Sequence, residues 1–583
     1  MTKGLDLVLL WHMHQPDYRV ERHGGENEFA MPWTYLHAIK DYVDMAAHLE
    51  RHEGMRAVVN FAPVLLEQIE DYAAQFRERR FRDPLLRCLA QARLDDLSLA
   101  ERRMLLDTCF RSNHRTMLDP YPPYANLYRI HREITAADAS AAVYLSGDYF
   151  SDLLTWYHLA WCGETERRRQ PLLMRLMAKG CGFDAGDRRA LLELIGELIA
   201  GLIGRYRALA EKGCIELSAS PLAHPIAPLL LDPSCARQAQ PDLPLPANPV
   251  YPGGRSRVLA HIDEALLSHE RCFGHRPEGL WPAEGAVSDP FVRLLAGGRF
   301  AWVASSESVL ANSLRHQGVD FDAERGRHLY RPWQLADCPG LTLFFRDERL
   351  SDLIGFDYAK WYGSDAVSHF VGELEAIVDA APDGERPVVS VILDGENAWE
   401  YYPYNAYYFL DHLYEALATH PTISVTTFAE RSTRTEGFGA LETLVAGSWV
   451  QGTLSTWIGH ADKNRAWELL CEAKRSYDLA LSGGTLGSAA ASAAARRLAC
   501  CESSDWFWWL GSANEKAAIA AFDDLFRENL KGLYGWLGFP PPTVLDRPVS
   551  QLEERPIQEA ARDGTMLRGQ PASAAGGASH DSD

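Results

Sequence analysis

The stretch Val388–Tyr402 (VVSVILDGENAWEYY) constrains the fold of this chain more than any other part of its sequence. It opens with a run of β-branched and aliphatic residues that has no helical spacing, which is typical of a strand buried on both faces. The run breaks at Asp394, and aromatic residues follow. In folds built from parallel strands, chemistry takes place at the carboxyl ends of the strands, so a carboxylate there is a catalytic candidate. Because Asp is also a common helix cap, Asp394 could equally start the next helix.

Six other segments also read as buried strands. They are Leu7–Trp11, Met55–Phe61, Cys214–Ser218, Gly279–Pro282, Phe300–Ala304 and Leu341–Phe345. A further segment, Ile423–Thr426, is a marginal strand candidate. Most of these strands are followed by helical periodicity, as in Arg255–Phe273. Repeated buried strands that alternate with helices predict an α/β barrel rather than a sandwich.

The length of 583 residues predicts more than one domain. We expect a catalytic barrel over 1–430, with a mainly helical insertion around 83–210 over the barrel mouth. Within that insertion, Ser112–Tyr128 is interpreted as an ordered aromatic loop. Residues 431–550 are expected to form a smaller helical domain that contributes to the active-site cleft, with Leu481–Ala495 as a flexible connector or frayed helix end. The polar stretch 551–583 is predicted to be a disordered tail.

Composition excludes several partner classes. The formal net charge of −21 argues against nucleic acid and anionic membranes, whereas a neutral polymer such as a glucan would be indifferent to it. No apolar run reaches the length of a membrane-spanning helix, and the short run Leu7–Trp11 lacks the features of a signal peptide. Eleven cysteines without CxxC spacing suggest reduced thiols. The cytoplasm is therefore the expected location, and the oligomeric state is left open.

The ends of the predicted strands present a set of chemically active side chains. These are His12, His14, His224, Glu284, Arg346, Asp347 and Asp394. Two carboxylates on separate strand ends are the equipment of a glycosidase: one attacks the anomeric carbon, and the other protonates the leaving oxygen and then activates water. Their pKa values must differ. Glu396, two residues beyond Asp394, is expected to raise the pKa of Asp394, which suits an acid/base.

Two other interpretations of the histidines remain open. His12, His14, His224 and Asp394 form a donor set of the kind that binds zinc, which would support metal-dependent hydrolysis. The set lacks a local signature such as HExxH. Equally, the histidines could be satisfied by hydrogen bonds in a polar barrel mouth.

Five segments carry a resemblance to a known family. HMHQPDY, ELSASPLAHPIAPL, GLWPAEGAVS, VILDGENAWEYY and TLSTWIGHADKNRAWELL resemble, in the same order, the five motifs of glycoside hydrolase family 57. The resemblance runs from residue 3 to about residue 550. It implies an incomplete TIM-like (β/α)7 barrel with a following helical domain, and a retaining mechanism on α-glucans without a metal or another cofactor. It places the nucleophile at Glu284 and the general acid/base at Asp394.

The resemblance also predicts substrate contacts. The family's substrate-site histidines fall on His12, His14 and His224, and the tryptophan of the fifth motif falls on Trp457. Further substrate-binding candidates lie in or beside the motifs: Gln15, Trp281, Arg346, Asp347, Glu396, Trp399 and His460.

The branch within the family is suggested by two further segments. GENAWEYY and FFRDERLSDLIGF resemble the α-amylase and amylopullulanase branch, which predicts a hydrolase of α-1,4 and, in some members, α-1,6 glucosidic bonds. A 4-α-glucanotransferase or branching enzyme is the alternative within the family, because these enzymes share the chemistry and differ in the acceptor. A non-catalytic glucan-binding protein is the alternative of another class.

Overall fold

The computed structural model of the chain describes residues 3–21, 27–136, 139–434, 437–484, 486–511, 514 and 516–550. The predicted tail at 551–583 lies outside the described residues.

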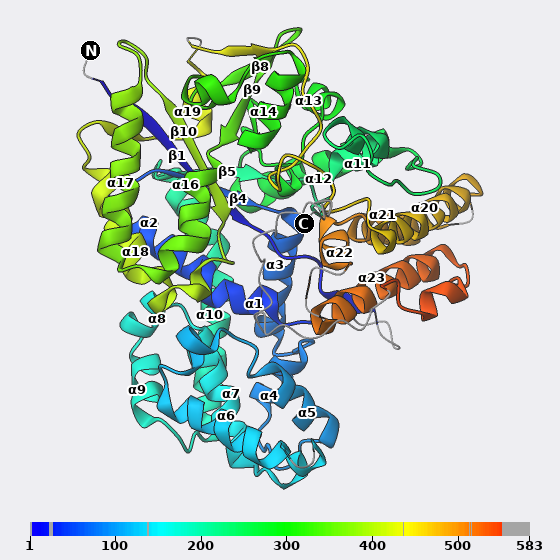
Figure 1. The fold of residues 1–583 in the computed structure, drawn as a ribbon. Coiled ribbons are helices and arrows are strands. Elements are labelled where there is room, and N and C mark those ends of the chain that lie inside the picture. The colour runs from blue at the N-terminus through cyan, green and yellow to red at the C-terminus, as the bar shows by residue number, and fades with distance from the viewer. Residues whose placement is uncertain are drawn as a thin grey trace, which may run out of the picture.

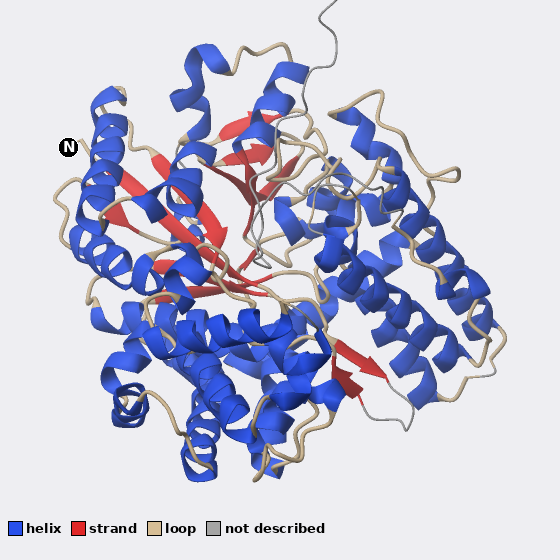
Figure 2. Ribbon diagram, turned by 60° about the horizontal axis from the view of Figure 1, so that its bottom comes forward, coloured by secondary structure: helices blue, strands red, loops and turns tan. Residues whose placement is uncertain are grey.

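Seven parallel strands form a closed barrel (Figures 1 and 2). In chain order they are β1 (Leu5–Met13), β4 (Ala57–Phe61), β5 (Ile215–Ala219), β6 (Gly279–Leu280), β7 (Trp302–Ser306), β9 (Cys338–Arg346) and β10 (Val388–Asp394). The ring closes because β10 pairs with β1 on one side and with β9 on the other. The seven predicted strands and the (β/α)7 class are confirmed. The marginal candidate is also a strand, β11 (Ile423–Val425), which pairs with the start of β1.

The alternation of side chains along β1 explains why the barrel is filled on both sides. Leu7, Leu9 and Trp11 belong to the large core between the strands and the surrounding helices. Val8 and Leu10 belong to a second core inside the barrel, which also holds aromatic residues of β7 and β9. Because successive side chains of a strand point to opposite faces, a continuously apolar strand is what this arrangement requires.

Short strands and helices surround the ring. Strand β8 (Trp333–Leu335) pairs antiparallel with β9, β12 (Gly439–Leu441) pairs with β8, and β2 (Arg19–Glu21) and β3 (Asn27–Phe29) form a separate hairpin. The helices outside the insertion and the C-terminal region are α1 (Trp33–His37), α2 (Val43–Arg51), α3 (Pro63–Glu78), α11 (Ala227–Leu231), α12 (Gly254–Phe273), α13 (Asp289–Leu295), α14 (Glu307–His316), α15 (Arg325–Leu329), α16 (Glu348–Asp352), α17 (Gly363–Ala380), α18 (Tyr407–Ala418) and α19 (Phe428–Ser432).

The helical insertion lies on one side of the barrel, in blue and cyan in Figure 1. It comprises α4 (Pro84–Ala90), α5 (Leu99–Thr108), α6 (Pro122–Thr135), α7 (Gly147–Trp161), α8 (Glu164–Arg169), α9 (Pro171–Lys179) and α10 (Ala185–Glu211). The prediction of an aromatic loop over Ser112–Tyr128 is wrong. A π-helical turn covers His114–Leu118, and α6 begins at Pro122. Proline at the first helical position is favourable because its missing N–H would be unpaired there anyway.

A second helical region follows the barrel, in orange in Figure 1. It comprises α20 (Ala461–Ser482), α21 (Ser488–Cys501), α22 (Ser504–Trp509) and α23 (Lys516–Leu537). The expectation of a flexible connector over Leu481–Ala495 is wrong for most of that stretch. Its alanines begin α21, since alanine has the highest intrinsic helix propensity. The predicted domain boundaries at 430 and 550 stay predictions.

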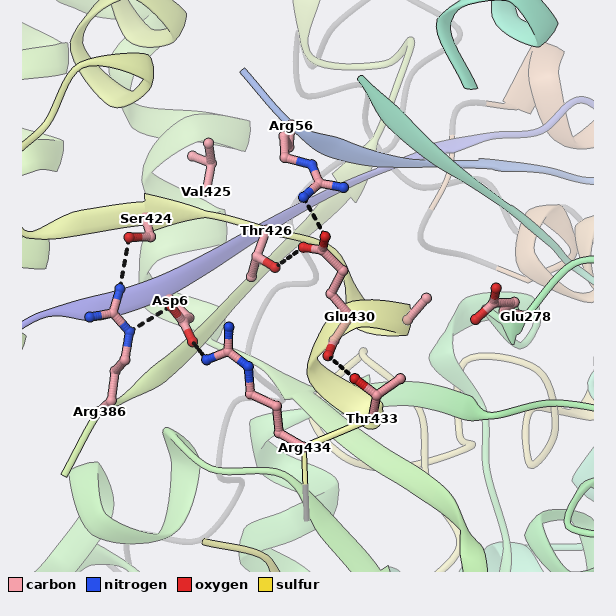
Figure 3. Close-up of a pocket in the computed structure, with 11 residues that line it drawn as sticks. Asp6, Arg56, Glu278, Arg386, Ser424, Val425, Thr426, Glu430, Thr433 and Arg434 are labelled. Carbon is pink, nitrogen blue, oxygen red and sulfur yellow. Dashed lines mark hydrogen bonds and ion pairs between the residues drawn. The ribbon is translucent and has the colours of Figure 1, made fainter. Parts of the chain in front are cut away.

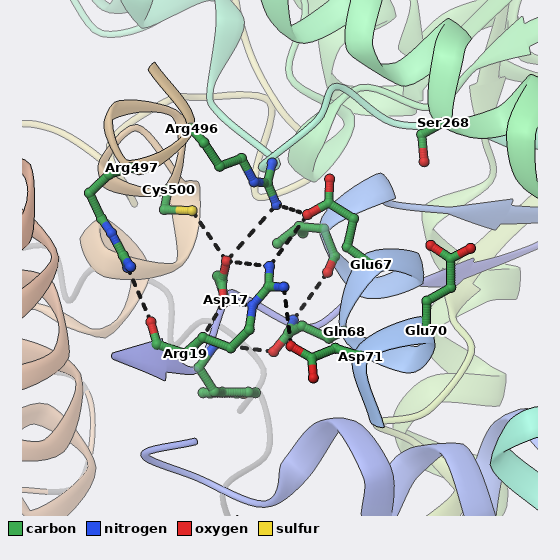
Figure 4. A network of polar contacts seen from close by, with 12 residues as sticks. Asp17, Arg19, Glu67, Gln68, Glu70, Asp71, Ser268, Arg496, Arg497 and Cys500 are labelled. Atoms are coloured by element: carbon green, nitrogen blue, oxygen red, sulfur yellow. Dashed lines mark hydrogen bonds and ion pairs between the residues drawn. The ribbon is translucent and has the colours of Figure 1, made fainter. Parts of the chain in front are cut away.

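A polar network joins α21 to the barrel (Figure 4). Asp17 accepts hydrogen bonds from Arg19 at 2.8 Å, and Arg496 lies 3.9 Å from the same carboxylate. Arg496 also pairs with Glu67 of α3. Burial would raise the pKa of Asp17, but Arg19 and the arginines of α21 hold it well below its usual range. The carboxylate therefore stays charged and ties the C-terminal helices to the segment that follows β1.

A hollow of about 750 Å³ opens at the amino-terminal end of the barrel (Figure 3). Charged side chains line it, and most of them are paired: Asp6 with Arg386 and Arg434, and Arg56 with Glu430. No helix among the described residues is long and apolar enough to cross a membrane. All eleven cysteines are free thiols.

Candidate active site

A polar layer lies directly above the apolar interior of the barrel. Leu10 of β1 is the register partner of Ile392 on β10 and of Val58 on β4, and all three belong to the interior core. Two residues further along, His12 is the partner of Asp394 and of Asn60. Inward positions recur every second residue, so His12 and its partners face the barrel interior as Leu10 and its partners do. The inward side chains therefore change from apolar to polar at one level, at the carboxyl ends of the strands. That level is where an α/β barrel carries its chemistry.

The histidines form a chain of hydrogen bonds in this layer. Nδ1 of His12 lies 2.7 Å from Oδ1 of Asn60, and its Nε2 lies 3.1 Å from Nε2 of His224. Because the Asn oxygen only accepts, His12 donates from Nδ1 and accepts from His224. Burial lowers the pKa of His12 to about 3 and that of His224 well below its usual value. Both rings are therefore neutral at physiological pH.

Glu284 lies in a strained turn after β6. Its φ is +58°, in the left-handed region that residues with a side chain rarely occupy. Nε1 of Trp449 donates to Oε2 of Glu284 at 2.9 Å, and the backbone N–H of Trp449 donates to the Glu284 carbonyl at 3.0 Å. His224, also at positive φ, lies 3.9 Å from Oε1 of Glu284. Backbone strain of this kind is concentrated at functional sites.

Asp394 ends β10, and the next residue must be glycine. A Cβ at Gly395 would overlap the sulfur of Met13, and the Gly395 N–H donates to the His12 carbonyl at 2.6 Å. Nδ2 of Asn397 donates to Oδ2 of Asp394 at 2.8 Å. The absence of a Cβ at Gly395 thus lets β10 approach β1 closely enough to hold Asp394 beside His12.

The C-terminal helical region supplies the remaining walls of the site. The hydroxyl of Ser504 lies 2.9 Å from Nδ1 of His224 and 3.4 Å from Oε1 of Glu284. Oδ2 of Asp505 lies 2.9 Å from Nε2 of His14. Just before these residues, Glu502 pairs with Arg257 and His261 of α12. That buried cluster fixes the start of α22 and so positions Ser504 and Asp505.

The catalytic candidates have raised pKa values. Burial, followed by the charges of Asp394 and Asp505, raises the pKa of Glu284 well above its usual value. Burial raises the pKa of Asp394 to about 6, and Asp505 adds to the rise, while Asn397, His14 and Arg346 oppose it. Because the charge of Asp394 raises the pKa of Glu284, ionisation of one carboxyl disfavours ionisation of the other.

The predicted cause of the Asp394 shift needs a correction. Glu396 was expected to raise the pKa of Asp394, but burial and Asp505 are what raise it. The influence runs the other way, because burial and the charge of Asp394 raise the pKa of Glu396. Glu396 turns toward β1 instead: its Oε1 accepts from the His14 backbone N–H at 3.2 Å and from Nε2 of Gln15 at 3.4 Å.

Several other predicted site residues gather around the two carboxyls. The ring of Trp281 lies 6.4 Å from that of His12 and 5.4 Å from that of Trp449. The guanidinium of Arg346 lies 5.4 Å from the Trp449 ring and also pairs with Asp352 at 3.1 Å. The rings of His14 and His224 stack at 3.8 Å.

Other predicted residues have contacts of a structural kind. Asp347 caps α16 and pairs with Arg325 at 3.2 Å. Trp399 is buried against Trp11 and donates to the Gly395 carbonyl. His460 caps α20. Trp457 is fully buried and contacts Trp508, three residues beyond Asp505.

The structure offers a different cation-binding trio from the predicted one. One ligand atom each from His14, His224 and Asp505 lies within 4.8 Å of the other two. Asp505 replaces both His12 and Asp394 of the predicted set. His12 instead uses both ring nitrogens in the hydrogen-bond chain, and Asp394 accepts a hydrogen bond from Asn397.

Sequence reasoning missed the contributions of Trp449, Ser504 and Asp505. The Ser-Ser-Asp run before an aromatic stretch indicates only the start of a helix, which α22 confirms. Trp449 precedes the fifth motif closely, and that proximity is the one signal that could have identified it.

Comparisons with known proteins place the chain in a family. A sequence model described as glycosyl hydrolase family 57 matches residues 8–441. No curated protein matches the chain.

Solved structures share the fold. A family 57 branching enzyme from Pyrococcus horikoshii superposes with a TM-score of 0.56 at 16% identity, covering 96% of this chain and 98% of its own. An α-amylase from Thermotoga maritima gives a TM-score of 0.53 at 13% identity, covering 92% and 94%. A family 57 branching enzyme from Thermococcus kodakaraensis gives 0.52 at 14% identity, covering 96% and 99%.

The matched segment contains six of the seven barrel strands and most of β1, together with Glu284 and Asp394. This chain therefore belongs to glycoside hydrolase family 57, a family of enzymes.

Proposed function

We propose that the protein is a retaining α-glucan hydrolase of the α-amylase or amylopullulanase kind, with Glu284 as nucleophile and Asp394 as general acid/base. The observation that carries the proposal is the presence of two carboxyls on separate strand ends, the buried Glu284 and the partly buried Asp394. Both have raised pKa values, and among the described residues neither forms an ion pair with Lys or Arg. Structural carboxylates in buried sites normally have such a partner, whereas catalytic ones are kept ready to exchange protons.

In the first step, the Glu284 carboxylate attacks the anomeric carbon and the glycosidic bond breaks. The leaving oxygen takes the proton of Asp394, so the departing chain leaves as a neutral alcohol. Positive charge that develops at the anomeric carbon favours the anion on Glu284, and the proton accordingly resides on Asp394. Trp449 stabilises the Glu284 anion by donating a hydrogen bond to it.

In the second step, Asp394 is a carboxylate and takes a proton from water. The resulting hydroxide equivalent attacks the anomeric carbon, and the bond to Glu284 breaks. Asp394 regains its proton and Glu284 its charge, so the site returns to its starting state. Two inversions give net retention at the anomeric carbon.

Unpaired ring nitrogens support a hydroxyl-rich substrate. Nδ1 of His14, Nε1 of Trp281 and Nε1 of Trp457 are buried and have no hydrogen-bond partner within the described residues. Buried polar atoms are rarely left unpaired, so a site with several of them is prepared for ligand groups. Sugar hydroxyls both donate and accept, and the tryptophan rings suit the apolar faces of glucose units.

The decisive experiment is product analysis with maltoheptaose, using wild-type protein beside Glu284→Gln. We expect shorter maltooligosaccharides, one new reducing end for each bond cleaved, and none of these products in the variant. The α-configuration of the first products, followed by NMR, checks retention. Products of the opposite configuration, or equal turnover by the variant, would refute the assignment.

Transfer to a sugar hydroxyl is the second candidate. Glu284 and its neighbours are buried beneath Ser504 and Asp505, and a site that restricts water favours a sugar acceptor. Incubation with maltotriose separates the two: longer chains without a net gain of reducing ends would mean transfer. A branching enzyme would instead form α-1,6 linkages from amylose.

Metal-dependent hydrolysis is tested separately through the trio of His14, His224 and Asp505. We expect full activity on maltoheptaose after dialysis against EDTA, because the double displacement uses carboxylates only. Loss of activity that zinc restores would favour the metal route.

A further inference from the structure

Exposed aromatic rings gather at one place on the surface. Among the described residues, large aromatic side chains are exposed at Tyr144, Trp361, Tyr362, Tyr404, Tyr408 and Trp536. Four of these six lie in two short segments, Tyr358–Gly363 and Tyr401–Tyr408. Exposed apolar groups are ordinary when scattered, but a contiguous group of them marks a binding surface.

The two segments touch each other. A Cβ added to Gly363 would lie 3.2 Å from the backbone nitrogen of Phe409, so the turn before α17 rests directly on the start of α18. The ring of Tyr358 lies 5.9 Å from that of Phe409. The four exposed rings of Trp361, Tyr362, Tyr404 and Tyr408 therefore form one surface, which we call the aromatic patch.

The patch is held in place from below. Tyr404, Asn405 and Ala406 have φ values of +57°, +52° and +58°, three consecutive left-handed residues. Each such residue costs free energy, and the buried Asn405 offsets part of it by bonding to Lys40 at 3.1 Å and to Asp44 at 3.0 Å. A turn of this kind is maintained only where the surrounding structure fixes it. Its effect is to hold Tyr404 out at the surface, 53% exposed.

The other rings are supported as well. Trp361 packs edge-on against Tyr358 and His369, with centroids 5.4 and 5.2 Å away. Tyr408 accepts a hydrogen bond from Arg168 of α8 at 3.1 Å, and the same guanidinium lies 5.1 Å from its ring. These contacts fix the rings while leaving their outer surfaces open.

The composition of the patch fits a carbohydrate. Its exposed apolar groups are Trp and Tyr rings, and within the two segments no Leu, Ile, Val or Met accompanies them. Exposed polar groups, including Lys360, Ser364 and Arg168, border the rings. Rigid rings stack on the C–H faces of pyranoses, and the polar border can bond to their hydroxyls.

The patch is carried by two connections of the barrel. The segment that carries Tyr404 and Tyr408 is the continuation of the loop that begins at Asp394, and the segment of Trp361 belongs to the connection that follows β9. Both connections leave from the carboxyl ends of barrel strands. We propose that the aromatic patch is a second α-glucan-binding surface, distinct from the catalytic pair, that holds a polymer chain. This inference rests on the proposed function, since it takes the same substrate class.

The test is glucan binding by a variant that lacks the two most exposed rings of the patch. Tyr362 is 82% exposed, so Tyr362→Ser combined with Tyr404→Ser removes aromatic surface with little loss of packing. The matched control is Tyr144→Ser, an 86% exposed tyrosine outside the patch. All variants are made in the Glu284→Gln background, and affinity electrophoresis in gels containing glycogen gives the apparent Kd. We expect the double variant to bind about tenfold more weakly and the control to bind like its parent.

Activity supplies a second readout in proteins with intact Glu284. The ratio of kcat/KM on amylose to kcat/KM on maltotriose should fall in the double variant, because only a long chain engages both sites. Equal glycogen binding by the double variant and its parent would overturn the inference even if maltoheptaose is cleaved. If instead the Glu284→Gln parent does not bind glycogen and the wild-type protein does not cleave maltoheptaose, the proposed function itself fails. A parent that is dimeric by light scattering, and a double variant that is monomeric, would show that a second copy of the chain covers the patch.

Discussion

The two ends of the barrel hold charge in opposite ways. At the amino-terminal end, the buried carboxylate of Asp6 is surrounded by Arg386, Arg431 and Arg434, at 2.7, 3.4 and 3.3 Å. At the carboxyl end, Glu284 is as deeply buried and Asp394 is partly buried, but among the described residues neither pairs with Lys or Arg. Asp6 is thus ion-paired at one end of the sheet, whereas Glu284 and Asp394 at the other end lack a cationic partner.

We infer from this difference that the charges at the amino-terminal end of the barrel stabilise the fold, whereas those at the carboxyl end serve catalysis. A buried carboxylate that is paired keeps its charge and contributes to folding, whereas carboxyls without such a partner have raised pKa values and exchange protons. Buried like charges without a counter-ion cost free energy, which the carboxyl end of the barrel tolerates because the reaction needs them. Substitutions at the carboxyl end should therefore mainly lower turnover, and substitutions at the amino-terminal end should mainly lower stability.

The largest effect is expected at Glu284. Glu284→Gln removes the nucleophile and should lower kcat on maltoheptaose by about three to five orders of magnitude, with the melting temperature unchanged or raised. The matched control is Glu278→Gln, because Glu278 lines the hollow just before β6 and Glu284 follows the same strand. Reducing-end assays should show normal turnover in the control. A similar loss in both variants would remove the distinction between the two ends.

The second-largest effect is expected for Asp394→Asn. Loss of the proton donor should lower kcat on maltooligosaccharides by about two to four orders of magnitude. A substrate with a good leaving group, such as a nitrophenyl maltooligosaccharide, needs little protonation and should be spared in the first step. Stopped-flow release of nitrophenol measures this directly. If both substrate types lose the same factor, Asp394 does not protonate the leaving group.

A smaller effect is expected at Asp505, which belongs to the C-terminal region. Asp505→Asn should lower kcat/KM by about ten- to a hundredfold, because His14 loses its charged partner. The same substitution should also shift the pH profile of kcat/KM in a predictable direction. Asp505 raises the pKa of Asp394, which must be protonated to act, so activity is lost as pH rises through that pKa of about 6. Without the Asp505 charge the pKa falls, and the alkaline limb of kcat/KM should move to lower pH.

The control for Asp505 is Asp524→Asn, an exposed carboxylate on α23 of the same helical region. Its pH profile should match the wild type. An alkaline limb that stays in place in Asp505→Asn, while activity falls, would assign Asp505 a structural role only.

The fold could be predicted from the sequence because its signal is local. Each barrel strand is a short apolar run, and a run buried on both faces is recognisable without knowledge of its neighbours. The errors arose where local composition was ambiguous. The prolines and tyrosines of Ser112–Tyr128 suggest a loop, yet Pro122 starts a helix, and the small residues before Cys500 suggest a flexible connector, yet they are helical.

Only the site residues that belong to the barrel could be predicted from the sequence. Glu284, Asp394 and the histidines follow recognisable strands or motifs, so their position at one end of the barrel follows from the topology. Ser504 and Asp505 reach the same site from a helix start more than a hundred residues after β10. Their placement depends on the pairing of Glu502 with Arg257 and on the network around Asp17, which are tertiary contacts without a sequence pattern.

The smallest effect on turnover is expected at the other end of the barrel. Asp6→Asn keeps the shape of the side chain but removes the charge that three arginines share. Arg431 is buried, whereas Arg386 and Arg434 are partly exposed and their attraction is screened by water, so we expect a loss of about 2 kcal/mol in the free energy of unfolding. For a chain of this length, that corresponds to a fall in melting temperature of about 2 °C, measured by calorimetry.

Turnover on maltoheptaose should stay within about twofold of the wild type in Asp6→Asn, because none of the charges that shift the pKa values of Glu284 and Asp394 comes from this end. The control is Asp263→Asn, which breaks an exposed pair with Arg299 and should change neither quantity. High salt should narrow the stability difference between Asp6→Asn and the wild type, since it screens the two exposed arginines but not the buried one. A variant with normal stability and impaired turnover would mean that the charges at the two ends are coupled through the sheet, and the division between stability and chemistry would have to be abandoned.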